Sequence, residues 1–530
     1  MANVQKIVHS SRKISARALA TTIQSDTSYE FLPWLLKEFH NLNDESIVEL
    51  ELDESKRFFR AFVAFGASIK QRHNHVPVLG TDGTFMKAKD YPGVYLNLVQ
   101  RDANARNIVL AIALVPGETA ENYLWFLRLC MRAGINFADF ALFADRGKVT
   151  NAVATLGASG HVIPLKHCMI HLLRNLKTQF KLDGPAFHAQ YLDDLGPENW
   201  TVHGNTEAYK PSVATTAKAR PLFGVRSTNF VESDNAKNIH NDIRFNLPFA
   251  ALHLAMADVM ETASDRRQEV ANMAKTAPIL TPHATALLKG QKDKAEAYSV
   301  RVSTASLLVV YIPAFGTEGH EVDVDARTCT CGYVEQMHLP CRHLIRALKH
   351  VGKLDTVEMC IHPMYKFENY KRAVDAVAYR LPIFAHRCPE PGVTVLPPLV
   401  TKSSGKPRTN RIASAGESGS KDNTYQHRPS STKKKYKCSA CGATDHNAKT
   451  CAKKGRKLVA SRSAGSCLWK DIPAACDRIL IMDLLNPDSD SDNDLDSGDD
   501  DDRDVDEFGF DANGRGVAQV VGQASNVFRL

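Results

Sequence analysis

The pattern of apolar and polar residues is most regular between Val76 and about Leu176. Three β-rich runs come first, separated by turn-like pieces, and they predict an antiparallel meander: VPVLGTDGTF, GVYLNLVQRD and NIVLAIALVPG. Helical spacing follows in TAENYLWFLRLCMRAG, with Thr119 as a cap and Gly134 as a stop. FALFADRG and HVIPLK then resemble strands, and the segments after them, VTNAVATLG and CMIHLLRNLKTQF, resemble helices. This βββαβαβα order predicts an α/β fold, a mixed sheet with helices packed on it.

The flanking segments have different patterns. Upstream, YEFLPWLLKEFHNL has helical spacing, SIVELELDE alternates like a short strand, and KRFFRAFVAFGASIKQ returns to a helical pattern, so residues 1–75 are expected to be mostly helical. Residues 186–330 are expected to be largely helical and to end in the β-like AYSVRVSTASLLVVYI and GHEVDVD. Residues 401–437 are rich in Ser, Thr, Lys and Arg with few large apolar side chains, which predicts a disordered linker.

Length and composition limit the class of protein. The 530 residues are enough for roughly three or four domains. No run of about eighteen apolar residues occurs, so no membrane span is expected, and the N-terminus has no apolar core of a secretory signal. In a reducing compartment, the twelve cysteines are better suited to bind metal or to be buried than to form disulfides.

Charge is distributed unevenly along the chain. The segment from Asp488 to Glu507 has a net charge of −11, so the remaining residues carry +18 of the chain's total of +7. This segment is expected to be disordered, and a basic body with an acidic tail favours a nucleic-acid partner for which the tail competes. The alternative, that both regions are only solvated surface charge, stays open.

One cysteine pattern lies in CTCGYVEQMHLPCRH. Its Cys-x-Cys-x9-Cys-x-His spacing offers three thiols and an imidazole, which together close a tetrahedral zinc site; the alternative is a group of buried free cysteines around a core histidine. The candidate ligands are Cys329, Cys331, Cys341 and His343. With its LPCRH ending, this stretch resembles the SWIM-type zinc finger over about fifty residues. The resemblance implies a DNA-binding or protein-binding role, often beside a transposase domain.

A second pattern, CSACGATDHNAKTC, has the Cys-x2-Cys-x4-His-x4-Cys spacing of the zinc knuckle. Its candidate ligands are Cys438, Cys441, His446 and Cys451. The basic flanks KKKYK and KKGRK favour a single-stranded nucleic acid or a phosphate backbone, and they also suit nuclear import or a solvated linker. The aromatic residue on which a base would stack is missing from the loop, although Tyr436 lies just before it.

Two carboxylates follow predicted strands. Asp82 lies in LGTDGTF at the end of the first strand, and Asp145 lies in LFADRG at the end of the fourth. Parallel neighbouring strands would bring both acids together over a pair of cations, the arrangement that cleaves phosphodiesters by in-line attack. Singly, either aspartate also suits a turn or a cap.

The succession GTDGTF, ALFADRGKVTNAV and HCMIHLLRNLK resembles the Mutator-like element (MULE) transposases, over roughly residues 46–351. The resemblance implies an RNase H-like core with a DDE triad, whose third acid in RSTNFVESDN is Glu232, with Asp234 and Asp242 as rivals. It also implies a Cys-x2-His pair, here Cys168 and His171, which shapes the site or only packs in the core. Many such proteins carry an N-terminal zinc-binding domain, but the first 75 residues here contain no cysteine.

The expected function is therefore DNA transposition: Asp82, Asp145 and Glu232 hold two Mg²⁺ or Mn²⁺ ions, and two Zn²⁺ sites assist DNA binding. The alternatives are an inactive, domesticated DNA-binding regulator, or an RNA-binding protein with the core as a scaffold. A nuclear location and a homo-oligomer are expected for a transposase.

The expected layout is an N-terminal region (1–75), a transposase core (76–250), a helical segment (251–300), a SWIM finger (301–353), an extension (354–400), a linker (401–437), a knuckle (438–451) and a tail (452–530).

Overall fold

The computed structural model describes residues 29–179, 191–192, 194–206, 219–315, 319–383, 386–388, 390 and 392–399. All of them belong to one compact unit of the chain. The predicted linker, zinc knuckle and acidic tail lie outside these residues. No helix in the described ranges is both long enough and apolar enough to cross a membrane.

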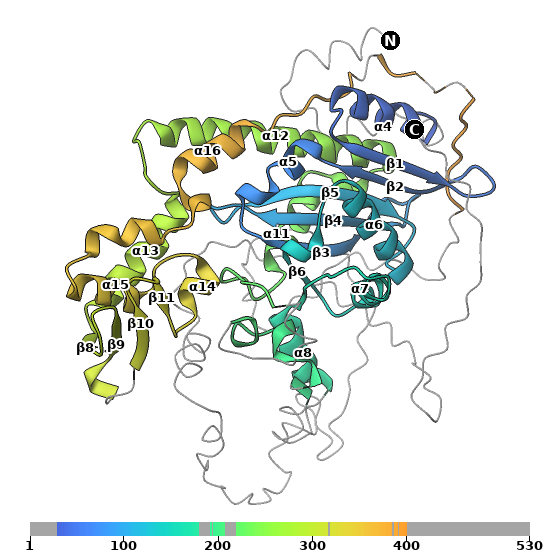
Figure 1. Ribbon diagram of the computed structural model, residues 1–530. Helices are drawn as coiled ribbons and strands as arrows, with labels where there is room; N and C mark the ends of the chain where they lie inside the picture. Colours follow the sequence, from blue (N-terminus) through green and yellow to red (C-terminus); the bar gives the residue numbers. More distant parts are fainter. Residues whose placement is uncertain are drawn as a thin grey trace, which may run out of the picture. The chain divides into compact units, whose positions relative to one another are not determined.

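A seven-stranded mixed sheet is the centre of the described fold, with the strand order β1-β2-β5-β4-β3-β6-β7 (Figure 1). The strands are β1 (Ile47–Leu52), β2 (Phe58–Ala64), β3 (Val78–Phe85), β4 (Val94–Arg101), β5 (Asn107–Val115), β6 (Ala141–Ala144) and β7 (Leu165–His167). Neighbours from β1 to β3 are antiparallel, whereas β3 with β6 and β6 with β7 are parallel. Because β4 runs opposite to both β3 and β5, the carboxyl ends of β3, β5, β6 and β7 share one edge.

The predicted meander and the strands and helices after it are confirmed, but the sheet is wider than the sequence predicts. KRFFRAFVA was expected to be helical, and this was wrong, because its residues 58–64 form β2. Phe58 packs on one face of the sheet and Phe62 on the other, so the strand is covered on both sides. A short apolar run buried on both faces has no alternation that distinguishes it from a buried helix.

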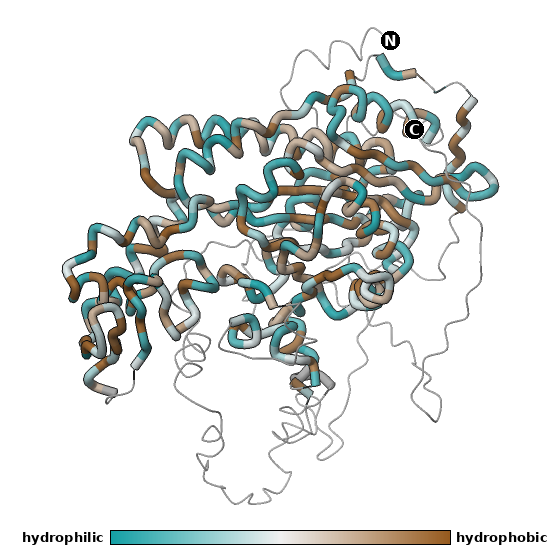
Figure 2. Tube along the Cα trace, in the orientation of Figure 1, coloured by the Kyte–Doolittle hydropathy of each residue, from teal (hydrophilic) through white to brown (hydrophobic). Residues whose placement is uncertain are grey.

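Helices cover both faces of this sheet, and Figure 2 shows hydrophobic residues concentrated along the central strands. The helices are α4 (Leu32–Leu42), α5 (Gly66–Lys70), α6 (Ala120–Arg132), α7 (Lys148–Ala158), α8 (Met169–Gln179), α11 (Asn229–His240), α12 (Pro248–Ala274), α13 (Pro282–Ala295) and α16 (Phe367–Asp375). The face under α6 and α7 has one apolar cluster, and the face under α4 and α12 has another. As predicted, Thr119 caps α6 by accepting a hydrogen bond from the backbone of Asn122.

Helix α11 lies unusually close to β3, and a glycine makes this possible. A Cβ atom at Gly80 would lie 2.3 Å from a methyl carbon of Val231 and 2.5 Å from the ring of Phe230. Only a residue without a side chain fits under the helix at this position. The first turn of α11 is therefore held over the middle of β3, two residues before Asp82.

A smaller antiparallel sheet follows, with the order β11-β10-β9-β8. Its strands are β8 (Ser299–Val302), β9 (Leu307–Tyr311), β10 (Gly319–Asp323) and β11 (Thr328–Cys329), and its helices are α14 (Tyr333–Met337) and α15 (Arg342–His350). Leu344 and Leu348 of α15 are buried in the same apolar cluster as Leu308 and Val310 of β9. The remaining helical turns are η1 (Arg72–Asn74), η2 (Phe137–Asp139), η3 (Pro197–Asn199), η4 (His203–Asn205), η5 (Ile243–Phe245), η6 (Pro313–Phe315), η7 (Leu354–Cys360) and η8 (Pro363–Tyr365).

Candidate functional sites

Asp82 and Asp145 lie beside each other just beyond the parallel pairing of β3 with β6. The prediction that Asp82 ends its strand was wrong, because β3 continues to Phe85 in its pairing with β4. Gly80 of β3 pairs with Phe143 of β6 in parallel register, and each aspartate lies two residues further along its own strand direction. Asp145 directly follows β6, and one of its carboxylate oxygens accepts a hydrogen bond from the backbone N–H of Gly147 (3.3 Å). Both residues are half-buried. The parallel pairing thus explains why two acids 63 positions apart meet.

Glu232 reaches the same place from the first turn of α11. Its Oε1 accepts a hydrogen bond from the hydroxyl of Thr228 (2.8 Å). One turn further along the helix, Asn235 donates from Nδ2 to Oδ2 of Asp82 (2.8 Å). The helix is therefore fixed to the strand by a side-chain hydrogen bond as well as by the close approach at Gly80.

The two rival acids are placed differently. Asp234 is buried, and its carboxylate faces Asn97 and the charges of Lys237 and Asp258. Asp242 lies beyond the C-terminus of α11 in a left-handed conformation, with a φ of 58°. Of the three candidates for the third acid, Glu232 is the one whose charge acts on both His171 and Asp82.

Negative charge is concentrated at this edge. Burial raises the pKa of Asp82 to about 7, and repulsion by Asp145, Glu118 and Glu232 adds to the effect, while a backbone hydrogen bond from Gly83 opposes it. Burial and the charge of Asp145 likewise raise the pKa of Glu118. The charge of Lys148 opposes the rise at Glu118. A group of acids with raised pKa values is typical of sites that bind cations or transfer protons.

Glu118 belongs to this group, and the sequence analysis missed it. It lies in the loop after β5, where the hydroxyl of Tyr123 donates to its Oε1 (3.1 Å). A Cβ atom at Gly83, the residue after Asp82, would lie 3.3 Å from the carboxyl carbon of Glu118. One feature of the sequence could have indicated it: Glu118 follows β5, which ends at the same edge as β3 and β6.

Cys168 and His171 form a hydrogen-bonded pair next to the acids. Burial of the Cys168 thiol opposes ionisation, but hydrogen bonds with His171 and Thr228 lower its pKa to about 7. The hydrogen bond with Cys168 raises the pKa of His171 to about 9, and the charges of Glu232 and Asp145 add to this. The backbone N–H of Thr228 lies 3.4 Å from Sγ of Cys168, so the pair is linked through Thr228 to Glu232.

The carboxylates are more widely spaced than the ligands of a closed metal site. Within the described ranges, no three of these acids bring their ligand atoms within 4.8 Å of one another. Carboxylate oxygens are nevertheless the donors that Mg²⁺ prefers, and it usually binds through one or two carboxylates and keeps water ligands. The donor set therefore fits hard divalent cations such as Mg²⁺ and Mn²⁺.

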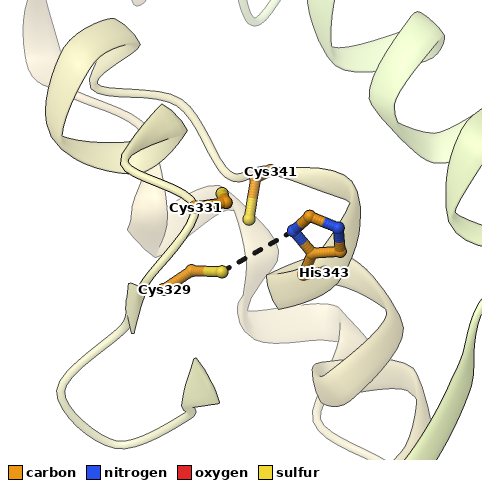
Figure 3. Close-up of side chains that lie close together, drawn as sticks. All are labelled: Cys329, Cys331, Cys341 and His343. Carbon is orange, nitrogen blue, oxygen red and sulfur yellow. Dashed lines mark hydrogen bonds between the residues drawn. The ribbon is translucent and has the colours of Figure 1, made fainter. Parts of the chain in front are cut away.

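Three thiols and an imidazole converge in the small sheet. The ligand atoms of Cys329, Cys331, Cys341 and His343 all lie within 4.8 Å of one another. Sγ of Cys329 lies 3.7 Å from Nδ1 of His343 (Figure 3). Tetrahedral zinc with a Zn–S bond of about 2.3 Å separates its ligand atoms by roughly 3.5–3.8 Å, so the group fits a zinc ion.

Local backbone structure explains this convergence. Cys329 ends β11, and the chain turns at once through Gly332, whose positive φ of 73° suits glycine and whose N–H donates to the carbonyl of Cys329 (3.2 Å). Cys331 lies within this turn. Cys341 is the N-cap of α15, and its sulfur accepts a hydrogen bond from the backbone of Leu344 (3.3 Å). His343 follows in the first turn of the same helix, as predicted.

The electrostatics of the group favour a bound cation. Burial alone would raise the pKa of Cys341, but hydrogen bonds from Cys329, Cys331 and the backbone of Leu344 hold it well below its ordinary value. Hydrogen bonds with the two other thiols, together with burial, raise the pKa of Cys329. The thiols thus share their protons, and metal binding must displace the protons that remain.

The comparison with protein families matches the SWIM zinc finger to residues 320–352, which contain all four ligands. The finger is of the SWIM type. The match begins after β8 and β9, within the expected range of 301–353. No curated protein matches the chain. The SWIM finger therefore supports zinc binding and is compatible with a nucleic-acid or protein partner, while the predicted knuckle ligands lie outside the described residues.

Proposed function

We propose that the chain is a DNA transposase of the Mutator-like type, in which Asp82, Asp145 and Glu232 hold divalent cations for DNA cleavage and strand transfer. The observation that carries this proposal is the meeting of three acids from two parallel strands and a helix. Burial raises the pKa of Asp82 to about 7, and the nearby charges of Asp145 and Glu232 add to this rise.

Strand order supports an RNase H-like core. Within the larger sheet, β5-β4-β3-β6-β7 consists of three antiparallel strands followed by two parallel ones, and α6 and α7 connect β5 to β6 and β6 to β7. The candidate acids lie at the carboxyl edge, where α/β sheets usually bind their ligands. In this interpretation β1 and β2 are an addition to the sheet.

Each side chain has a defined role in the proposed chemistry. Mg²⁺ or Mn²⁺ bound here would activate the attacking oxygen and stabilise the leaving one. Asp82 and Asp145 supply the central negative charge, and Asn235 fixes the orientation of Asp82 through its hydrogen bond. Glu118 is a fourth acid on the opposite side of Asp82 from α11. His171, with its raised pKa of about 9, is protonated at neutral pH and offers a positive charge to a substrate phosphate.

The SWIM finger would help to hold the DNA, because transposition needs contacts beyond the cleaved bond. The predicted knuckle would add contacts to single-stranded nucleic acid, and the basic charge of the chain outside its acidic segment favours a DNA partner. A nuclear location and a multimeric assembly belong to the same proposal.

The purified chain, incubated with Mg²⁺ or Mn²⁺ and DNA that carries the inverted repeats flanking its own locus, tests the proposal. Metal-dependent nicking that is lost in Asp145→Ala, and retained in Asp139→Ala, would support it. Asp139 is an exposed residue six positions earlier in the chain, which makes it a matched control. Equal DNA binding by all three proteins without any cleavage would contradict it and favour a DNA-binding regulator.

A further inference from the structure

Two phenylalanine side chains are exposed beyond the candidate acids. Phe85, the last residue of β3, is 52% exposed, and Phe245, the last residue of η5, is 49% exposed. Among the aromatic residues whose side-chain burial the structure describes, no other is exposed. Single exposed apolar residues are common on proteins, but the packing of the core gives no reason for two exposed aromatic rings at one place.

Hydrogen bonds hold the two phenylalanines at the same place. Nε of the buried Arg244 donates to the carbonyl of Phe85 (2.9 Å). The backbone N–H of Lys87 donates to the carbonyl of Arg244 (2.7 Å), and Phe245 follows Arg244 directly in the chain. The turn η5 is therefore fixed beside the segment that continues β3.

The exposed side chains lie on one side of this segment. Phe85, Lys87 and Lys89 are exposed, whereas the two residues between them are buried. In an extended chain, residues two apart point to the same side. The ring of Phe245 belongs to this side as well, because Nζ of Lys87 lies 6.0 Å from its centroid. Together these side chains form an aromatic platform, which consists of Phe85, Lys87, Lys89 and Phe245.

The exposed charge of the aromatic platform is positive. Neither Lys87 nor Lys89 forms an ion pair within the described ranges. The charge of Asp90, the next residue, acts on Tyr29, where it adds to the effect of burial in raising the pKa. Asp242, at the start of η5, is half-buried and sets one negative charge against the two lysines. The balance favours a partner that carries phosphates.

The aromatic platform is connected to the candidate acids by two elements. Phe85 lies three residues beyond Asp82 along β3, which corresponds to about 10 Å in an extended strand. Helix α11, which carries Glu232 and whose Asn235 is bound to Asp82, leads into η5. A DNA strand with one phosphate at the acids therefore has the platform within a few nucleotides.

We propose that the aromatic platform binds unpaired bases of a single DNA strand, which stack on Phe85 and Phe245 while neighbouring phosphates contact Lys87 and Lys89. Aromatic rings among basic side chains bind single strands without reading their sequence, because every base has a π face. A protein partner fits less well, since lysine is depleted at the centre of protein interfaces. The passage of this strand to the acids rests on the proposed transposase function, whereas the stacking does not.

Photocrosslinking of the full chain to a single DNA strand of about 15 nucleotides tests the proposal. The strand carries iododeoxyuridine, a base that couples on irradiation to an aromatic ring on which it stacks. Mass spectrometry locates the coupled residues, so binding at the predicted knuckle does not obscure the result. We expect coupling to Phe85 or Phe245. Coupling at other residues, with none at these two, would overturn the proposal.

Affinities measure what the rings contribute, in a full chain whose predicted knuckle is disabled by Cys438→Ser. Phe85→Ala combined with Phe245→Ala should weaken binding of the single strand at least about fivefold. It should leave binding of a duplex of the same sequence unchanged, because the bases of a duplex stack on each other. Ile279→Ala shortens an apolar side chain that is 64% exposed, and as the control it should change neither affinity. Equal losses for both DNA forms would contradict stacking.

The lysines and the kind of strand are tested in the same background. Lys87→Gln should reduce the slope of log affinity against log salt by about 0.7, the value for one phosphate contact on a single strand. Lys275→Gln, at an exposed position just after α12, should leave the slope unchanged. Loss of RNA binding in the double phenylalanine variant, with DNA binding intact, would contradict the assignment to DNA.

These results are distinguishable from those that test the proposed function. Ring-dependent binding of single-stranded DNA without metal-dependent nicking would support the platform and contradict the transposase. Nicking that is lost in Asp145→Ala, with no coupling at Phe85 or Phe245, would support the transposase and contradict the platform.

Discussion

At the scale of single residues, the electrostatics centre on Asp82. Its carboxyl group has a pKa of about 7 in the folded chain, against an ordinary value of 3.8. The folded state therefore holds this proton more tightly than the unfolded state does. As the pH rises from about 4 to above 7, ionisation of Asp82 costs the folded state progressively more free energy.

Asp82→Asn should accordingly stabilise the cation-free protein, and more so at high pH. The gain in the free energy of unfolding should be small near pH 4 and should reach up to about 4 kcal/mol at pH 8, because one pKa unit corresponds to about 1.4 kcal/mol. Urea unfolding at several pH values measures it, with Asp265→Asn on an exposed position of α12 as the control. A gain that does not change between pH 5 and pH 8 would contradict the raised pKa of Asp82.

Sequence reasoning found Asp82 and Asp145 because each follows an apolar run, and the parallel pairing of β3 with β6 explains their meeting. It missed Glu118, whose surroundings in PGETAEN indicate only a loop before a helix cap. The proximity of Glu118 to Asp82 depends on strand order, which the chain does not display locally. The contact between Cys168 and Thr228 likewise joins segments sixty residues apart.

At the scale of elements, the turn after β11 and the start of α15 are held together by the four zinc ligands. Cys331→Ser should reduce the zinc content by one equivalent per chain and weaken the docking of α15, because a buried thiol ligand is lost. Metal analysis and thermal unfolding measure these effects. Cys388→Ser changes an exposed cysteine outside the group and should alter neither; equal zinc content in both variants would contradict the ligand assignment.

The close packing of α11 on β3 leads to a second prediction at the scale of elements. Gly80→Val would place methyl groups where Val231 and Phe230 now lie, so α11 must move away from β3. We expect a loss of about 1–3 kcal/mol in the free energy of unfolding, together with loss of metal-dependent cleavage as Glu232 is displaced. Gly157→Val adds the same side chain in α7, where a Cβ atom meets nothing within 4 Å. If Gly80→Val cleaves DNA as the wild type does, Glu232 is not a member of the site.

Most helices and strands could be predicted from the order of apolar and polar residues, because amphipathic helices such as α6 and α15 bury one face. The exception is β2, which is buried on both faces and therefore lacks the alternation of a half-exposed strand. The zinc ligands were predictable from spacing alone because all four lie within fifteen residues. A cavity of about 340 Å³ between β5, α11, α12 and α16 could not be predicted in this way, since its lining comes from segments between Ser68 and Val377.

At the scale of the whole molecule, charge separation along the chain is the dominant feature. Deletion of residues 488–507 removes a net charge of −11 and should tighten non-specific DNA binding at low salt, because the acidic segment competes with phosphate for basic groups. The difference should shrink as salt is added. Filter binding over a salt series measures it. Deletion of the nearly neutral residues 511–530 serves as the control, and equal affinities for both truncated proteins would exclude competition by the acidic segment.

The proposed function requires that the acids at the carboxyl edge of the large sheet bind divalent cations. Anomalous scattering from crystals of the full chain soaked in Mn²⁺ tests it most directly, with Asp82→Asn crystals for comparison. We expect a manganese peak between Asp82 and Asp145 that is lost in the variant. Manganese elsewhere in the crystal, with none at these two carboxylates, would contradict the claim.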